Sequence, residues 1–299
     1  MSTEPPVDFV ERQNWLEPIE TQSQKAVAAA FNSLPDGGRP IKNFLHGTWL
    51  GHPLHPMLTD VPLGAWTATL VLDLMDASGR KDCRAGADVT LAVGLTGAAC
   101  AALAGITDWH DTDGPARRVG ALHGMLNLLG ACLYTGSLIA RKQRNRSAGR
   151  ALAYAGFVTA AASAYLGGNL VYGKQIGVNH APEDPHVADW TNVMAAADLQ
   201  DGKAHRAEVN GVKLLLVRDG GELRCLAEVC SHLGGPLAEG TIEDGAVTCP
   251  WHASRFSLSD GSVIDGPATH PQPCFEVRQN GDRIQVKSRP QTGGGQLPV

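Results

Sequence analysis

Three long stretches without charged residues constrain the fold of this chain more than any other feature of its sequence. They run from the residue after Asp88 to Thr107, from Val119 to Ala140, and from Ala151 to Tyr172. The hydrocarbon core of a bilayer, about 30 Å thick, is crossed by about 20 residues of α-helix. We therefore predict three transmembrane helices, with a soluble bundle of buried helices as the alternative.

A fourth stretch, Met57 to Met75, is less apolar because it contains Asp60 and Asp73. It can span a membrane only if these carboxylates lie near its ends or face the interior of a bundle. Gly120 and Gly124 form a GxxxG pair, which permits two helices to approach closely. We expect an all-α, four-helix transmembrane domain over residues 46–176, preceded by a tail (1–45) in which AVAAAFNSL forms a short helix.

The last hundred residues have a different pattern. The segment NHAPEDPHVADW has the proline and acid content of a linker, which we place at residues 177–190. Beyond it, short apolar runs are separated by turn pairs such as Asn210-Gly211, Asp244-Gly245 and Asn280-Gly281. Such pairs are typical of β-hairpins. We therefore expect an all-β domain over 191–288 and a disordered tail over 289–299.

Two short segments of this β domain each contain one cysteine and one histidine. Cys230-x-His232 is followed, after sixteen residues, by Cys249-x-x-His252. Two Cys and two His can bind zinc, but zinc fingers usually place both cysteines in one pair and both histidines in the other. One residue of each kind in each loop suits a 2Fe-2S cluster in which one iron takes both thiolates and the other both imidazoles.

The segments CSHLGGPL (230–237) and CPWHASRF (249–256) resemble the cluster-binding loops of Rieske proteins. The resemblance implies one 2Fe-2S cluster per chain, with Cys230 and Cys249 on one iron and His232 and His252 on the other. The tripeptide GPA at 266–268 resembles the family's proline loop, so Pro267 is expected to cover a third side of the cluster.

Departures from the family pattern indicate which kind of Rieske protein this chain resembles. Rieske proteins of cytochrome bc complexes add a disulfide-bonded cysteine to each loop, where this chain has Gly235 and Trp251. Those high-potential proteins also place a serine and a tyrosine hydroxyl near the cluster. This chain keeps Ser254 but has Phe256 at the tyrosine position. We expect a ferredoxin-type centre with a potential in the lower half of the range of about −150 to +300 mV.

The helical half also resembles a known family. The segments GTWLGHPLHPMLTDVPLGAW, ITDW and LGGNLVYG resemble an uncharacterised four-helix integral membrane family that is found fused to Rieske domains. Its histidines His52, His55 and His123 are candidates for a haem, quinone or metal site, with Asp60 and Asp108 as supporting groups. The alternative is that these histidines only cap helices at the membrane interface.

The sequence favours an electron carrier over a self-contained enzyme. Only eleven residues follow Ser288, too few for the second iron domain of a ring-hydroxylating oxygenase. We expect a membrane-anchored component of an oxidoreductase system that passes single electrons between a redox partner protein or a quinone and an acceptor. The alternative is a redox-sensing or haem- or quinone-binding module without turnover. A net charge of −5 gives no reason to expect nucleic acid.

We expect an integral protein of a bacterial inner or plasma membrane, in contact with the lipid bilayer. Basic residues gather in RKQRNRSAGR (141–150) and after the first helix, which by the positive-inside rule places the Rieske domain outside the cytoplasm. Iron–sulfur clusters are usually inserted in the cytoplasm, however, and we see no export signal at the start of the chain. The sequence therefore leaves the side of the membrane open.

Overall fold

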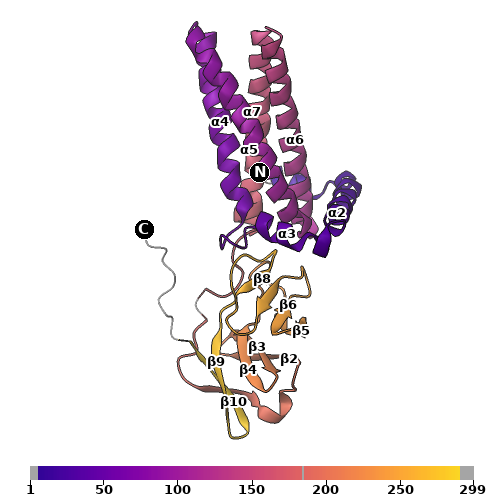
Figure 1. Ribbon diagram of the computed structural model, residues 1–299, viewed down its shortest axis with the longest axis vertical. Helices are drawn as coiled ribbons and strands as arrows, with labels where there is room; N and C mark the ends of the chain where they lie inside the picture. Colours follow the sequence, from indigo (N-terminus) through magenta and orange to yellow (C-terminus); the bar gives the residue numbers. More distant parts are fainter. Residues whose placement is uncertain (1–5, 184, 290–299) are drawn as a thin grey trace, which may run out of the picture. The chain divides into compact units, whose positions relative to one another are not determined.

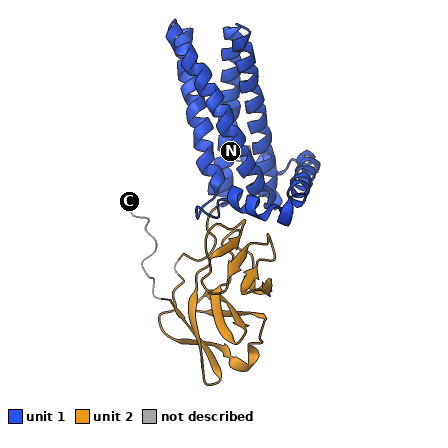
Figure 2. Cartoon of the chain, viewed as in Figure 1, with its two compact units in different colours: residues 1–177 blue, residues 178–299 orange. Residues whose placement is uncertain are grey.

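The computed structural model describes residues 6–183 and 185–289. These residues divide into two compact units, 1–177 and 178–299, shown in blue and orange in Figure 2. The first unit is helical and the second is built from β-strands. The expected disordered tail at 289–299 lies, except for Arg289, outside the described residues.

Seven helices form the first unit. They are α1 (Pro6–Glu11), α2 (Glu17–Asn32), α3 (Arg39–His46), α4 (Leu54–Ala77), α5 (Arg84–His110), α6 (Gly114–Lys142) and α7 (Arg146–Gly168), which continues as a π-helical turn over Asn169–Gly173. Figure 1 shows α4 to α7 as the long helices of this unit. Helices α4 and α5 pack together as one hairpin, and α6 and α7 as another.

Three of the four expected membrane spans are confirmed by length and composition within the described residues. The candidates are Lys81–His110, Gly114–Lys142 and Arg146–Gly173. The fourth, α4, is 24 residues long but carries Asp60, Asp73 and Asp76, so it is not apolar enough to count as a span by composition.

The N-terminal segment is more structured than the single short helix expected within it. Helix α2 begins at Glu17, well before AVAAAFNSL, and α1 and α3 were not predicted. Val7, Val10 and Leu16 are buried against Val119 and Leu166 of the long helices. In addition, the buried Glu20 carboxylate lies 3.1 Å from Arg117. These contacts make residues 6–46 part of the helical unit.

The second unit contains three small antiparallel sheets. Their orders are β1–β10–β9, β2–β3–β4 and β5–β6–β7–β8. The strands are β1 (Thr191–Ala195), β2 (Ala204–Val209), β3 (Val212–Asp219), β4 (Glu222–Ala227), β5 (Thr241–Glu243), β6 (Ala246–Thr248), β7 (Arg255–Ser257), β8 (Val263–Asp265), β9 (Phe275–Asn280) and β10 (Arg283–Ser288).

The predicted turn pairs connect strands as expected. Asn210-Gly211 joins β2 to β3 with φ of 50° and 80°, and Asp244-Gly245 joins β5 to β6 with φ of 51° and 69°. Positive φ at both central residues is the geometry that matches the twist of paired strands. These hairpins fix the register of the sheets from which the cysteine–histidine loops project.

Candidate metal centre

Two loops of the second unit, 230–235 after β4 and 249–254 after β6, have the same backbone hydrogen-bond pattern. In the first, the Cys230 N–H donates to the Gly235 carbonyl, and the Gly234 N–H donates to the Cys230 carbonyl, both at 2.9 Å. In the second, the Cys249 N–H donates to the Ser254 carbonyl at 2.9 Å, and the Ala253 N–H donates to the Cys249 carbonyl at 3.1 Å. The two loops are therefore closed turns of matching design.

Each turn needs a left-handed residue four positions after its cysteine. Gly234 supplies it in the first loop with φ of 78°, and Ala253 in the second with φ of 59°. Glycine adopts this conformation at no steric cost, whereas alanine is strained there. The turns direct the backbone N–H groups of the residues two and three positions after each cysteine toward its sulfur.

The two thiols lie together in the interior. Cys230 is 1% exposed and Cys249 3% exposed, and both belong to the cluster of buried side chains around Leu215 and Phe256. The hydrogen bond from the Cys230 thiol, assisted by the backbone N–H groups of Trp251 and His252, lowers the pKa of Cys249 to about 6. The same hydrogen bond, together with burial, raises the pKa of Cys230. One of the two cysteines is thus prepared to be a thiolate near neutral pH, as metal binding requires.

The two imidazoles lie closer to the surface than the thiols. His232 and His252 are half-buried, with ring centroids 4.9 Å apart and ring planes at 86°. Trp251 is 56% exposed beside them. A group held by all four side chains would have its thiolate side inside the protein and its imidazole side at the surface.

The segment that contains Pro267 is tied to the second loop. The Ala268 N–H donates a 3.0 Å hydrogen bond to the Ser254 hydroxyl, and Ser254 and Pro267 are both buried. Phe256 is fully buried among the same side chains as the two thiols. The seven residues that the sequence placed around the cluster lie in these two loops, in β7 directly after the second loop, and in the segment hydrogen-bonded to it: Cys230, His232, Cys249, His252, Ser254, Phe256 and Pro267.

Gly235 lies directly against one thiol. A Cβ atom at this position would be 2.7 Å from the Cys249 sulfur and 3.2 Å from the Trp251 ring, so a side chain fits only if the loop moves. Two thiols and two imidazoles in this arrangement fit the donor set of a 2Fe-2S cluster with one all-sulfur iron and one histidine-bound iron.

Comparisons with known proteins agree with this geometry. Residues 189–276 match the family model of the Rieske [2Fe-2S] domain, and residues 51–180 match that of a predicted membrane protein family, DUF2231. Ferredoxin CarAc of Metapseudomonas resinovorans is 31% identical over 98 residues, which cover 32% of this chain and 92% of the ferredoxin. The ferredoxin subunit of 3-phenylpropionate/cinnamic acid dioxygenase from Escherichia coli (strain K12) is 37% identical over 91 residues, covering 30% and 85%.

The chain therefore belongs to the Rieske [2Fe-2S] family, and it binds a 2Fe-2S cluster. Its helical region is similar to the predicted membrane protein family over the matched residues. Human apoptosis-inducing factor 3 is also similar, at 30% identity over 118 residues, or 40% of this chain. The matched segment spans only 20% of the length of that human protein.

The histidines of the helical unit separate into different environments. His52 is exposed, with its Nδ1 atom 3.0 Å from the Pro53 carbonyl. His55 and His123 face each other, with ring centroids 6.3 Å apart. Asp108, expected to support these histidines, instead accepts a 2.8 Å hydrogen bond from His46, which also lies 3.3 Å from Asp111. Sequence reasoning missed the buried role of His46, because its place directly before the helix-ending Gly47 gave no distinctive signal.

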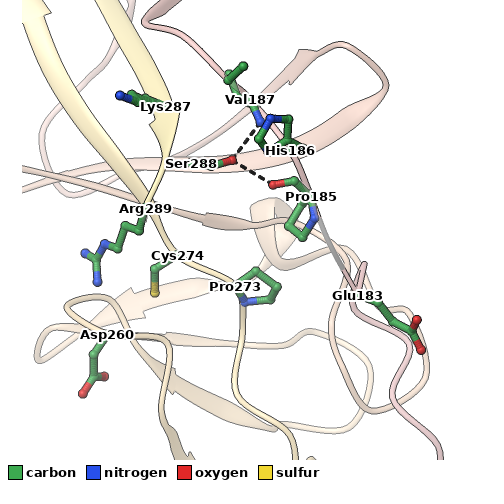
Figure 3. Close-up of a pocket in the computed structure, with 11 residues that line it drawn as sticks. Glu183, Pro185, His186, Val187, Asp260, Pro273, Cys274, Lys287, Ser288 and Arg289 are labelled. Carbon is green, nitrogen blue, oxygen red and sulfur yellow. Dashed lines mark hydrogen bonds between the residues drawn. The ribbon is translucent and has the colours of Figure 1, made fainter. Parts of the chain in front are cut away.

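A pocket of about 610 Å³ lies elsewhere in the second unit, between residues 183–188 and the end of β10 (Figure 3). Ser288 closes one wall, because its hydroxyl accepts a hydrogen bond from the Val187 N–H at 2.7 Å and donates one to the Pro185 carbonyl at 3.0 Å. The described residues that line this pocket do not include the four candidate cluster ligands. It is therefore separate from the metal centre.

Proposed function

We propose that this protein is a membrane-anchored Rieske-type electron carrier, which passes single electrons between a redox partner, either a reductase or a quinone, and an acceptor. Cys230 and Cys249 bind one iron of the cluster, and His232 and His252 bind the other. When bound, the cluster takes up and releases one electron at a time.

The observation that carries this proposal is the difference in burial between the two kinds of ligand. The thiols are 1% and 3% exposed, whereas the two imidazoles are half-buried. The imidazole edges thus offer a short route between the cluster and a partner docked at this surface. The buried sulfurs are kept from water by Leu215, Leu237 and Phe256.

The relatives supply the class of partner. The names of two similar proteins describe a ferredoxin and a dioxygenase ferredoxin subunit, and both match this chain over most of their own length. By analogy, the second unit accepts an electron from a reductase and delivers it to an oxidase or oxygenase component. Anchoring by the helical unit would confine this exchange to partners at the membrane.

The fourth helix can complete a membrane bundle because Asp73 and Asp76, two of its three acidic residues, have basic partners. Asp73 forms a buried ion pair with Arg141 of α6, and Asp76 lies 2.8 Å from Arg84 and 2.7 Å from Arg150. Paired charges that face the interior of a bundle are the form in which charged residues are tolerated in membranes. We therefore propose four spans, α4 to α7.

Stopped-flow reduction tests the carrier role. The full-length protein in detergent is mixed with a reductase or with a quinol, and cluster reduction is followed by its visible absorbance. A carrier is reduced many times per second and is reoxidised by an added acceptor. The variant His52→Ala, which changes an exposed histidine of the other unit, serves as the control. Reduction over minutes, with no turnover in the presence of an acceptor, would support the sensing alternative.

A further inference from the structure

The two helical hairpins of the first unit, α4–α5 and α6–α7, share a repeated sequence pattern. LHPML at 54–58 in α4 recurs as LHGML at 122–126 in α6. The same interval of 68 residues separates His55 from His123 and Trp66 from Tyr134. In the second helix of each hairpin, an interval of 62 residues relates Gly94 to Gly156 and Gly105 to Gly167.

Equivalent residues make equivalent contacts. A Cβ on Gly94 would lie 2.2 Å from the Trp66 ring, and one on Gly156 would lie 3.0 Å from the Tyr134 ring, so each glycine makes room for the aromatic residue of its own hairpin. The two aromatic rings then stack on each other, with centroids 4.1 Å apart and planes at 17°. The hairpins are thus related by an approximate two-fold axis that passes between these rings.

The two histidines obey the same symmetry. The Nδ1 atom of His55 lies 2.8 Å from the Ala101 carbonyl of α5, and that of His123 lies 2.8 Å from the Ser163 carbonyl of α7. Because a carbonyl oxygen can only accept, both Nδ1 atoms carry the proton and Nε2 keeps its lone pair in each ring. The Ser163 hydroxyl, 2.9 Å from the His123 Nδ1 atom, donates its own proton to the His123 carbonyl and can therefore accept from Nδ1 as well. Gly105 and Gly167, four residues after these carbonyls, admit the rings: a Cβ would lie 2.7 Å from the His55 ring and 3.1 Å from the His123 ring.

Histidines that bind a metal are commonly fixed in this way, by donating the second ring nitrogen to a backbone carbonyl. The two rings lie close together at right angles, with centroids 6.3 Å apart and planes at 87°. Two iron–nitrogen bonds of about 2.0 Å, each extended by roughly 1.1 Å from nitrogen to ring centre, give a centroid separation of about 6 Å. The spacing is that of two imidazoles on opposite sides of one metal.

The protein provides two ligands here and not more. Among the described residues of the helical unit, no group of three or more His, Cys, Asp or Glu side chains is placed to hold a single metal ion. A bare cation would need further donors, whereas a haem brings four nitrogens of its own and leaves two axial positions, which two histidines can fill. His123 also lies within the apolar candidate span Gly114–Lys142, in surroundings that suit a porphyrin, and helix bundles often build such sites from facing helices.

We propose that His55 and His123 are the axial ligands of one haem, held on the approximate two-fold axis between the two hairpins. The Asn127 amide, which donates a 3.0 Å hydrogen bond to the His123 Nε2 atom, gives way when that nitrogen binds iron. The proposal concerns a second cofactor and does not depend on the function proposed for the cluster.

The test is the haem content of the full-length protein, expressed with added 5-aminolevulinate and purified in detergent. We expect about one haem per chain by the pyridine haemochromogen assay, with the optical and EPR spectra of six-coordinate, low-spin iron. His55→Gly and His123→Gly should each lose the low-spin spectrum, and added imidazole should restore it. His52→Ala, which changes the exposed neighbouring histidine, should keep both haem and spectrum.

Two results would overturn the proposal. One is the absence of haem from the wild-type protein although 5-aminolevulinate was supplied. This result does not depend on whether the variants fold. The other is an unchanged low-spin spectrum in both glycine variants, which would mean that any haem is bound elsewhere. The EPR signal of the reduced 2Fe-2S cluster is recorded on the same samples. Its presence or absence tests the function proposed for the cluster separately from the haem.

Discussion

Two side chains next to the cluster ligands differ in what they can offer the sulfurs. Ser254 has a hydroxyl that accepts the Ala268 N–H, which leaves its own proton available to donate. Phe256 has no hydroxyl, and its fully buried ring belongs to the same apolar cluster as both thiols. Hydrogen bonds to sulfur stabilise the reduced, more negative cluster, so these positions adjust the reduction potential.

We predict that Phe256→Tyr raises the potential and that Ser254→Ala lowers it, each by several tens of mV. A hydrogen bond to a charged group contributes about 1.5 kcal/mol, and about 59 mV for one electron corresponds to 1.4 kcal/mol. Redox titration followed by circular dichroism measures both shifts. Ser257→Ala, an exposed change in the same strand, is the control. Equal potentials in all four proteins would show that hydroxyls at 254 and 256 do not reach the sulfurs.

Gly235 is predicted to be needed for cluster binding. Gly235→Ala places a methyl group 2.7 Å from the Cys249 sulfur and should greatly reduce the iron content of the purified protein. Gly221→Ala is the matched control: its φ of 89° makes alanine strained, but a Cβ there meets open space. The control should lose roughly 1 kcal/mol of stability and keep its iron. Normal iron content in Gly235→Ala would show that the loop adapts.

At the scale of residues, the ligands could be predicted because their spacing and neighbours are specific. The contact of Gly235 with the Cys249 sulfur could not, because it depends on how the two loops approach each other in space. The same is true of the hydrogen bond from Ala268 to Ser254, which joins residues fourteen positions apart.

The long helices are joined at one end by buried charges. The Arg141 side chain pairs with Asp73 of α4, lies 2.9 Å from Asp88 of α5 and donates a 3.0 Å hydrogen bond to the Ser137 hydroxyl. Asp73 is fully buried. These ion pairs therefore connect α4, α5 and α6, and removing the Arg141 side chain leaves the buried Asp73 without its main opposite charge.

We predict that Arg141→Ala destabilises the helical unit by roughly 3–5 kcal/mol, because it leaves the Asp73 carboxylate buried without its main partner. Thermal unfolding of the full-length protein in detergent, followed by helical circular dichroism, measures the effect. Lys142→Ala changes the exposed neighbour and should leave the midpoint almost unchanged. The double variant Asp73→Leu/Arg141→Leu should recover much of the loss. A single variant as stable as the control would contradict the account.

The end of α3 contributes a pH-dependent contact. His46 is 2% exposed, and although burial acts in the opposite direction, hydrogen bonds to Asp108 and Asp111 raise its pKa to about 9. A folded-state pKa above the unfolded value of about 6.5 stabilises the fold below pH 6.5, and this contribution disappears as the pH rises to 9. The contribution is up to about 3 kcal/mol.

In the wild type, the temperature of the unfolding midpoint, followed by the helical signal, should therefore decrease as the pH is raised from 6.5 to 9. In His46→Gln it should change less over the same range. The glutamine side chain keeps a donor at this position but does not titrate. The same slope in both proteins would show that His46 does not contribute to the pH dependence.

At the scale of elements, hairpins and apolar helices could be predicted because each depends on local sequence. Asn210-Gly211 and Asp244-Gly245 specify their own turns, and the uncharged stretches specify helices. Helix α1 could not be predicted, since the burial of Val7 and Val10 depends on contacts with α6 and α7. The repeat of LHPML as LHGML was visible in the sequence. The significance of this repeat could be seen only in the structure, which pairs His55 with His123 and stacks Trp66 on Tyr134.

The whole molecule combines two units whose sequences match the models of different families. The helical unit has three helices apolar enough to cross a membrane, and the β unit contains the cluster site. If the helical unit is the anchor, the protein should remain in the membrane pellet after a carbonate wash at high pH and be released by detergent. A fragment beginning at Val178 should not pellet. Release of the full-length protein by carbonate would contradict membrane insertion.

The central claim is that two cysteines and two histidines hold a 2Fe-2S cluster. EPR of the dithionite-reduced, full-length protein tests it most directly. We predict a rhombic signal with a low average g value, coupling from two histidine nitrogens in pulsed experiments, and loss of this signal in His232→Ala and in His252→Ala. A protein that contains zinc and gives no signal, or a signal with the higher average g of an all-cysteine cluster, would contradict the account.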